Sequence, residues 1–307
     1  SWDDLIPQVV WRATDRGFLT RLLPDLRRPD FETDIAPKLA GATTEREKKI
    51  AAIRAMLDAY DSLVPRWKGV VWTAGAELEA EDEGIELPWA NIKYSTTMYM
   101  GGVDDSDYYH QLMDYGIPAI GEYMDLETLA QYKYHLDIGG GGGTTWSGTF
   151  EKLAMPGVLF HHETPTMDYN HARIKPWVHY IPVEEELYDL KEKYEWAEAH
   201  PKEAQAISDR ATELIKSLGT DDGFRDFFRE FYVDPLRQVV DAYQPLEAGG
   251  SWRDFIREHR SDMRPMIKCD GYTTSYSPGA NDDCENLSDH DLERRRQSVG
   301  DQMTVTV

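Results

Sequence analysis

Five consecutive glycines, residues 139–143, follow an apolar segment and precede a run of hydroxyl-bearing residues. Glycine has no Cβ, so the backbone of such a run can approach an anion closely. If a helix begins just after the glycines, the free N–H groups of its first turn point toward the same anion. The pattern predicts a phosphate-binding loop. A glycine loop without a ligand stays open as the alternative, because the run matches neither GxGxxG nor GxxxxGK[ST].

Hydroxyl and basic side chains around the glycines complete the predicted phosphate site. The hydroxyls would donate hydrogen bonds to phosphate oxygens, and Lys152 would supply a positive charge one helical turn further along. Trp146, at the expected start of the helix, either stacks on a ring of the ligand or packs on the sheet. The predicted binding residues are Gly140, Gly141, Gly142, Gly143, Thr144, Thr145, Trp146, Ser147, Thr149 and Lys152.

Two acidic residues are candidates for a general base, the group that accepts a proton from a reacting hydroxyl. Asp15 lies in a polar turn that follows a predicted strand, and Asp137 ends the strand before the glycines. Each could instead cap a loop or serve as a hydrogen-bonded structural acid. The residue types therefore leave a catalytic and a structural interpretation open for both.

Four histidines lie within nineteen positions, and two acids lie among them. Their spacing fits no zinc pattern, and adjacent residues of a strand point to opposite faces of the sheet. We therefore predict no metal site. His179 either contacts a bound ligand or forms hydrogen bonds within the core. The residues considered are His161, His162, His171 and His179, with Glu163 and Asp168.

The glycine loop must be held by a strand before it and by a helix and strand after it. We expect a strand over residues 134–138, a helix over 146–155 that ends at Pro156, and a strand over 158–160. This is a βαβ unit, so the fold class is α/β. Further strands are predicted over 7–11, 70–72, 92–94 and 178–183, with a solvated loop over 77–86. Thr44 and Asp125 are typical N-cap residues, and they predict helices over 45–60 and 126–132.

The C-terminal part of the chain is predicted to be helical. Helices are expected over 184–200, from Pro201 onward, and over 224–243, with a break at 221–223. The aromatic segment 224–243 is interpreted as a core helix. We predict a domain over residues 1–245 and a polar, loosely ordered tail over 246–307. Cys269 and Cys284 in that tail form one disulfide or remain free thiols.

Composition excludes several classes of partner. The chain has 307 residues, 41% of them hydrophobic, and a formal net charge of −23. Such an acidic surface repels nucleic acid and anionic lipid. No stretch approaches the roughly 20 apolar residues that a membrane-spanning helix needs, and the first residues do not resemble a signal peptide.

Three segments carry a resemblance to a known family. YKYHLDIGG, WSGTFEKL and ARIKPWVHYIPV together resemble the CAP10-like glycosyltransferases, glycosyltransferase family 90. Residues 175–183, KPWVHYIPV, match a block of that family throughout, and VWRA at 10–13 is similar to its W/F-R-G strand end. The resemblance extends from about Val9 to Tyr243 and is most specific over 131–183.

The resemblance implies an inverting glycosyltransferase of the GT-B fold. The chain would then be the Rossmann-like, donor-binding half, with a helical C-terminal segment. It would bind a UDP-sugar as donor substrate, hold no tightly bound cofactor, and transfer glucose or xylose to a hydroxyl of a glycan or glycoprotein. Arg12 and the glycine loop would contact the diphosphate. The family also implies the secretory pathway lumen, either Golgi or endoplasmic reticulum.

Two departures from the family pattern stand in this chain. Thr149 occupies the position of an arginine in W-S-G-R-F, so Lys152 or Arg12 would have to compensate for the missing charge. The acceptor-binding half and its usual general base would precede Arg12, so we expect the chain to be a fragment or a reduced form of the family. A non-catalytic nucleotide-sugar-binding module is therefore the alternative. A nucleotide-dependent oxidoreductase ranks last, because the family blocks have no place in one.

Overall fold

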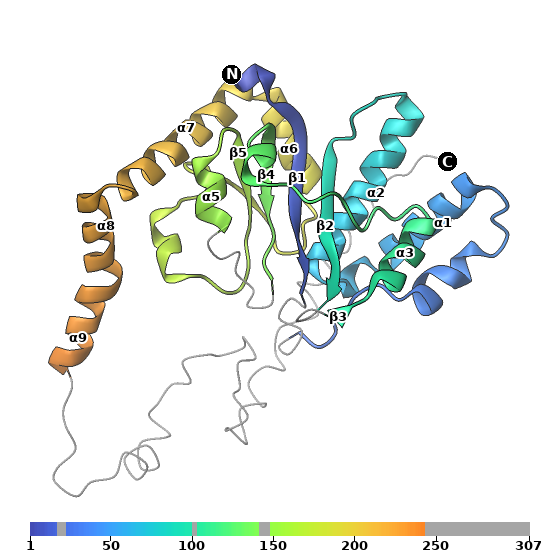
Figure 1. The fold of residues 1–307 in the computed structure, drawn as a ribbon, viewed down its shortest axis with the longest axis horizontal. Coiled ribbons are helices and arrows are strands. Elements are labelled where there is room, and N and C mark those ends of the chain that lie inside the picture. The colour runs from blue at the N-terminus through green and yellow to red at the C-terminus, as the bar shows by residue number, and fades with distance from the viewer. Residues whose placement is uncertain (17–22, 100–102, 141–147, 243–307) are drawn as a thin grey trace, which may run out of the picture. The chain divides into compact units, whose positions relative to one another are not determined.

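The computed structural model describes residues 1–16, 23–99, 103–140 and 148–242 (Figure 1). The chain divides into two compact units, the first spanning Ser1–Lys216 and the second beginning at Ser217. The predicted boundary at 245, the predicted tail 246–307 and both cysteines lie outside the described residues.

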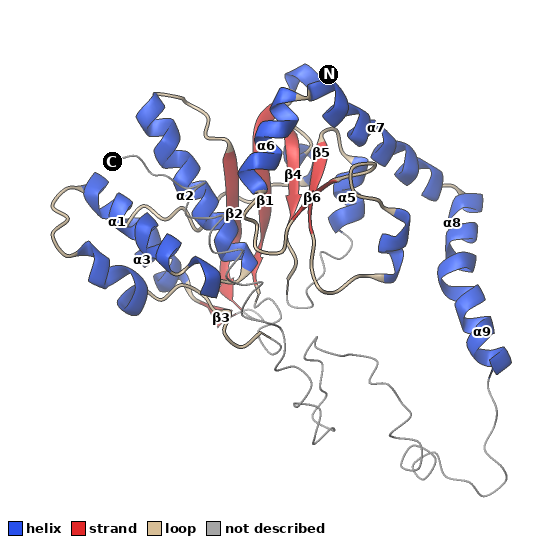
Figure 2. Cartoon of the chain, turned by 180° about the vertical axis from the view of Figure 1, so that it is seen from behind, coloured by secondary structure: helices blue, strands red, loops and turns tan. Residues whose placement is uncertain are grey.

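A six-stranded sheet forms the centre of the first unit. The strands are β1 (Ile6–Asp15), β2 (Ala90–Tyr99), β3 (Val103–Asp104), β4 (Tyr132–Asp137), β5 (Val158–His162) and β6 (Ile181–Val183). Their order is β3-β2-β1-β4-β5-β6, and every neighbouring pair is parallel except β2 with β3 (Figures 1 and 2). The predicted α/β, Rossmann-like sheet is confirmed. The chain leaves β1 toward one edge and β4 toward the other, which places a topological switch point between their carboxyl ends.

Alternation along β4 assigns the helices to the two faces of the sheet. Its even-numbered residues face α2 (Pro65–Glu83) and α6 (Leu190–Ala199), since Tyr134 packs on Tyr194 and Ile138 lies beside Gly69. Its odd-numbered residues face α5 (Gly148–Ala154), because Asp137 accepts a hydrogen bond from Thr149. The same alternation continues in β5, where His161 and His162 point to opposite faces, as predicted.

The remaining helices of the first unit surround this core. They are α1 (Glu45–Asp58), α3 (Ser106–Asp114), α4 (Leu126–Leu129) and α7 (Pro201–Leu218), with short helical turns η1 (Trp2–Asp4), η2 (Phe31–Ile35), η3 (Ala36–Leu39), η4 (Tyr60–Ser62) and η5 (Tyr169–Arg173). The predicted caps are confirmed: Thr44 accepts from Glu47 N–H, and Asp125 accepts from Thr128 N–H. The helix expected from Pro201 is confirmed as well, with Ala204 and Ile207 buried.

The strand predicted over 70–72 and the loop predicted over 77–86 are both wrong. Residues 65–83 form the single helix α2, with Pro65 at its first turn rather than after the end of α1. Val70, Val71 and Trp72 are all buried, because α2 is covered on more than one side. A helix that is buried all round shows no amphipathic period, and its apolar run is then indistinguishable from a buried strand.

The strand predicted over 178–183 is shorter than expected, since β6 begins at Ile181. Residues 176–180 instead form a tight turn that a bridge between Pro176 and Tyr180 closes. Trp177 adopts a left-handed φ of 60° there and is 42% exposed. The helix predicted from 184 begins only at Leu190.

The second unit is described over residues 217–242, and most of these residues are helical. Its elements are α8 (Asp221–Phe228), η6 (Arg229–Val233) and α9 (Asp234–Ala242). The break predicted at 221–223 is wrong, because Thr220 caps α8 and residues 221–223 form its first turn. No residue of these elements is buried, so the interpretation as a core helix is not confirmed. In the part of the chain that is described, no helix has the length and apolarity to cross a membrane.

Candidate functional site

A half-buried arginine, Arg66, spans the switch point between β1 and β4. Arg66, in the first turn of α2, donates from Nη1 to the carbonyl of Thr14 at 2.7 Å and from Nη2 to the carbonyl of Ile138 at 3.4 Å. Its Nε is buried and has no hydrogen-bond partner among the residues that the structure describes. Open α/β sheets bind ligands beyond the carboxyl ends of their strands at such a point. Arg66 therefore places a positive charge where this fold class presents its ligands.

The glycine run begins directly beside this guanidinium. A Cβ added to Gly140 would lie 2.5 Å from Arg66 Nη2, so a larger residue there would push the guanidinium out of its present position. Seven of the predicted binding residues lie outside the described residues: Gly141, Gly142, Gly143, Thr144, Thr145, Trp146 and Ser147. The start of the predicted loop and the arginine therefore occupy one place.

His162 fixes the first glycine of the loop. Its Nδ1 accepts from Gly139 N–H at 3.1 Å, so Nε2 carries the proton and donates to the carbonyl of Glu185 at 2.7 Å. Burial lowers the pKa of His162 to about 4, which keeps the ring neutral and this tautomer in place. Because Trp72 of α2 donates to the Leu187 carbonyl, the 184–189 segment holds His162 against the sheet.

Asp137 is buried and fully engaged at the end of β4. One carboxylate oxygen accepts from Thr149 Oγ1 at 2.8 Å, and the other accepts from His161 Nδ1 at 2.9 Å. Burial raises the pKa of Asp137, but the charge and hydrogen bond of His161 outweigh it and leave the pKa below its usual range. Asp137 therefore carries a negative charge, and a buried carboxylate–imidazole pair forms between the two strand ends.

Lys152 is the second cation of this region. Its Nζ lies 3.4 Å from where a Cβ on Gly148 would stand, so the side chain curls back over the first turn of α5. Burial lowers the pKa of Lys152, and the charge of Asp137 opposes that shift. Thr149 is buried with its hydroxyl bound to Asp137, so the position of the family arginine holds a structural donor.

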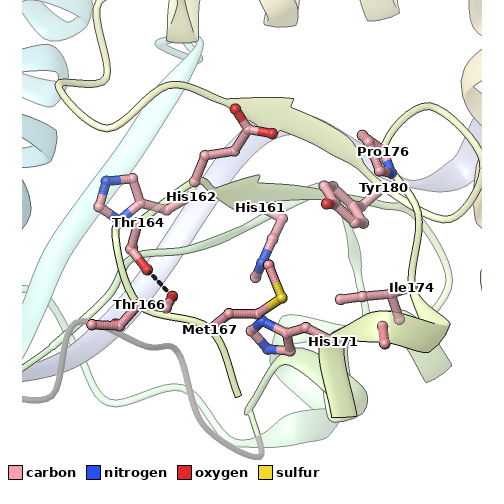
Figure 3. Close-up of a pocket in the computed structure, with 11 residues that line it drawn as sticks. His161, His162, Thr164, Thr166, Met167, His171, Ile174, Pro176 and Tyr180 are labelled. Carbon is pink, nitrogen blue, oxygen red and sulfur yellow. Dashed lines mark hydrogen bonds between the residues drawn. The ribbon is translucent and has the colours of Figure 1, made fainter. Parts of the chain in front are cut away.

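A cavity of about 410 Å³ opens beside the carboxyl end of β5 (Figure 3). His161, His171 and Tyr180 line it, together with the apolar side chains of Met167 and Ile174. The His161 ring stands nearly perpendicular to its neighbours, with centroids 5.2 Å from His171 and 4.7 Å from Tyr180. The Asp137–His161 pair thus connects the end of β4 to an open space large enough for a sugar or a nucleobase.

Asp15 ends β1 inside a buried polar and aromatic cluster. Its Oδ2 accepts from Tyr109 OH at 2.9 Å and Trp67 Nε1 at 3.1 Å, and Arg28 Nε lies 3.4 Å away. The Arg28 guanidinium stacks on Tyr108 at 3.6 Å. Burial raises the pKa of Asp15, while Arg28 opposes the shift. Asp15 is 0% exposed, and the structure gives it partners that hold the end of β1.

Arg12 and His179 have partners away from Arg66. The Arg12 guanidinium donates to the carbonyl and side chain of Asn91, the second residue of β2, and to the Glu122 carbonyl. His179 Nδ1 accepts from Lys175 N–H at 3.1 Å within the 176–180 turn. The contacts of both residues with a diphosphate or nucleotide stay predictions. The described residues contain no group of three His, Cys, Asp or Glu side chains that could hold a metal ion.

Two features of this site do not follow from the sequence analysis: the position of Arg66 and the pairing of His161 with Asp137. Arg66 escapes because its helix reads as a strand, although Pro65 before it is a typical first helical residue. The pairing of His161 with Asp137 could have been predicted from the sequence. The βαβ unit predicts adjacent parallel strands, and the register places these two residues opposite each other.

Comparisons with known proteins agree with the resemblance. Residues 101–231 match the family model of glycosyl transferase family 90. Protein O-glucosyltransferase 1 of Homo sapiens is 33% identical over 103 residues, which cover 33% of this chain and 25% of that protein. Protein O-glucosyltransferase 2 of Danio rerio is 35% identical over 84 residues, covering 25% of this chain and 15% of that protein. Protein O-glucosyltransferase 3 of Mus musculus is 30% identical over 79 residues, with coverages of 25% and 15%. The matched segments thus span a quarter or less of each relative.

Proposed function

We propose that this chain, whose residues 101–231 belong to glycosyltransferase family 90, is the donor-binding part of a glycosyltransferase. It would bind a UDP-sugar, with glucose or xylose as the sugar, for inverting transfer to a hydroxyl of a protein or glycan. Its similarity to proteins named O-glucosyltransferases supports the class of reaction. The single observation that carries the donor site is Arg66, whose guanidinium spans the switch point beside Gly140.

The site supplies what departure of a nucleoside diphosphate requires. Negative charge grows on the leaving diphosphate as the glycosidic bond breaks, and fixed cations lower the energy of that state. Arg66 is held by two carbonyls and needs no reorganisation to meet a phosphate oxygen. Lys152 adds a second charge at the start of α5. The amides of the glycine loop would complete the cradle.

The proton of the acceptor hydroxyl needs a base, and both predicted carboxylates are buried away from solvent. Asp137 is 1% exposed and Asp15 is 0% exposed, and both are bound to donors. We therefore place the base in the acceptor-binding half that the family resemblance implies. The second candidate function, a nucleotide-sugar-binding module without turnover, is favoured by the same observation. Localisation in the secretory pathway lumen belongs to this proposal, through the resemblance alone.

Calorimetric titration with UDP, UDP-glucose and UDP-xylose tests the proposal, with Arg66→Ala as the variant. The expected result is binding to the wild-type chain and a loss of about 10–100-fold in affinity in Arg66→Ala, the scale of a lost charge-assisted hydrogen bond. Arg46→Ala serves as the matched control, because Arg46 is half exposed and pairs with Glu81 and Asp82 on the surface.

Three outcomes separate the alternatives. Binding of UDP to the wild-type chain without sugar transfer or hydrolysis favours the binding module. Equal affinity in Arg66→Ala and Arg46→Ala contradicts the role of Arg66. Absence of UDP binding to the wild-type chain contradicts both candidate functions.

A further inference from the structure

The cavity beside β5 contains imidazole nitrogens with unused hydrogen-bonding capacity. His171 is 10% exposed, and its buried Nε2 has no hydrogen-bond partner in the described part of the chain, where the Asp168 carboxylate lies 3.9 Å from it. Among the described residues, His161 forms its hydrogen bond through Nδ1, which leaves Nε2 for the cavity. Figure 3 shows both rings converging on the side chain of Met167. Buried polar atoms in native proteins are normally satisfied, so the buried Nε2 of His171, in a ring that packs against His161 in the same cavity, points to a ligand.

Asp137 determines which proton each ring presents. Its carboxylate holds the Nδ1 proton of His161, so Nε2 accepts a hydrogen bond when the ring is neutral and donates one when the ring is charged. Burial lowers the pKa of His161, but the Asp137 charge outweighs it and raises that pKa. Burial and the neighbouring His161 lower the pKa of His171. His161 therefore takes the extra proton first, and the cavity offers a donor beside an acceptor.

The other walls of the cavity favour a neutral, partly apolar ring over an anion. Met167, Ile174 and Tyr180 present apolar surface, and the hydroxyl of Thr164 is occupied by the Thr166 carbonyl at 2.6 Å. The acid Glu163 lines the opening and would repel a phosphate or carboxylate. A volume of about 410 Å³ holds one such ring with room to spare.

We propose that His161 and His171 recognise a neutral ring that carries a hydrogen-bond acceptor next to a donor, with Asp137 as the positioning residue. Uracil carries a carbonyl next to an N–H, and a sugar carries adjacent hydroxyls. The two sources share this chemistry, and both are parts of a UDP-sugar. The inference rests on the proposed function, because it takes the ligand to be part of a UDP-sugar. Its new part is that His161 and His171 select the ring. It also makes binding dependent on the proton of His161.

Several other charged or titratable groups surround His161 and contribute to its proton affinity. The acids Asp137 and Glu163 favour the charged ring, and Asp168 acts through its neighbour His171. Lys152 disfavours it, and the ring is also close to His162, His171 and Tyr180. Asp137 is the one that contacts the ring directly, so its removal should lower the pKa of His161 most.

Titration of uridine and of methyl α-glucoside, which both lack phosphate, tests the inference by calorimetry between pH 6 and pH 8. One of the two probes should bind and thereby identify the ring. Its affinity should fall at least tenfold in His171→Phe and fall much less in His171→Gln, which keeps a donor and an acceptor. His110→Phe, at an exposed position of α3, is the matched control and should bind as the wild type does.

The pH profile separates recognition from a merely structural role. Affinity for the probe should decrease as pH rises through the pKa of His161, because the charged ring is the donor. In Asp137→Asn the midpoint of that decrease should move to lower pH, while a structural effect would lower affinity equally at every pH.

Each remaining result decides the matter. Binding of neither probe, or equal binding by wild type and His171→Phe, overturns the inference. If UDP affinity depends on Arg66 and ignores both histidines, the inference fails while the proposed function stands. If a probe binds through the histidines but UDP does not bind, the proposed function fails and the cavity remains a ring-binding site.

Discussion

Asp137 and His161 meet because β4 and β5 are adjacent parallel strands in which the two residues lie opposite each other. The sequence predicts both strands and the polar residue that ends the first, so half of this pair follows from pattern alone. The hydrogen bonds to Thr149 and His161 do not follow, because they depend on rotamers and on the twist of the sheet. The position of Asp137 at the end of a strand could be predicted, whereas the hydrogen bonds of its carboxylate could be seen only in the structure.

Lys152→Ala should weaken UDP binding by about 1–3 kcal/mol if this lysine compensates for the missing family arginine. The physical reason is the loss of a cation next to α5, where Thr149 supplies no charge. Calorimetry measures the change, with Lys175→Ala, at an exposed position, as the control. An unchanged UDP affinity in Lys152→Ala would reject compensation.

Buried neutral histidines should make the folded chain sensitive to acid. Burial lowers the pKa of His135 and of His162 to about 4, against about 6.5 in an unfolded chain. The unfolded state therefore binds these protons first, and stability falls as pH drops from 6.5 toward 4. When the pH is lowered from 7 to 5, the lowered pKa of each histidine should reduce the free energy of unfolding by about 2 kcal/mol.

Urea denaturation at several pH values measures this loss. His135→Gln, which removes one of the two rings, should reduce the pH dependence by about one proton. The same slope in wild type and variant would show that His135 is not buried in its neutral form.

At the scale of elements, α2 decides how well the site could be foreseen. The helix carries Arg66 to the switch point and anchors the segment that holds His162. Its buried residues lie on more than one face, so the apolar run 70–72 carries no helical period and predicts a strand. By contrast, α1 and α4 have capping residues, and their starts could be predicted from Thr44 and Asp125. Capping residues at helix ends can be recognised in the sequence. The hydrophobic period of a helix cannot be recognised when the helix is buried on more than one side.

Two glycines within α2 should respond oppositely to alanine. A Cβ on Gly69 would lie 2.6 Å from Ile92 Cγ2 and 3.1 Å from Ile138 Cδ1. A Cβ on Gly75 would have no described atom within 4 Å apart from the backbone of its own helix. Gly69→Ala should therefore destabilise the chain by about 1–3 kcal/mol through overpacking. Gly75→Ala should stabilise it by up to about 1 kcal/mol through helix propensity.

Urea unfolding of both variants gives the comparison under identical conditions. Because Ile138 also carries the carbonyl that binds Arg66, Gly69→Ala should weaken UDP binding as well. Stabilisation by Gly69→Ala would contradict the close approach of α2 to the sheet.

At the scale of the whole molecule, all elements of the site belong to the first unit. The sheet, Arg66, the start of the glycine run and the cavity lie within Ser1–Lys216, and α7 ends at Leu218. Residues 1–218 expressed alone should fold and bind UDP with the same Kd as the full chain. Thermal unfolding and calorimetry test this prediction. Loss of UDP binding in the shortened chain would show that the second unit contributes to the site.

The matched segments cover only a small part of each relative, which limits what the comparisons indicate about this chain. Matched segments span 25% or less of the lengths of these relatives. The α/β class and the βαβ unit around the glycines could be predicted, since strand, glycine and helix-end signals are local. The sugar and the acceptor could not, since pocket differences of one hydroxymethyl group leave no pattern in a single sequence.

A crystal structure of the chain with UDP is the most direct test of the central claim, that the switch point between β1 and β4 binds a nucleoside diphosphate. The account predicts phosphate oxygens within hydrogen-bonding distance of Arg66 and of the backbone at Gly140. An empty switch point at a UDP concentration that saturates the protein, or UDP bound elsewhere on the chain, would contradict it.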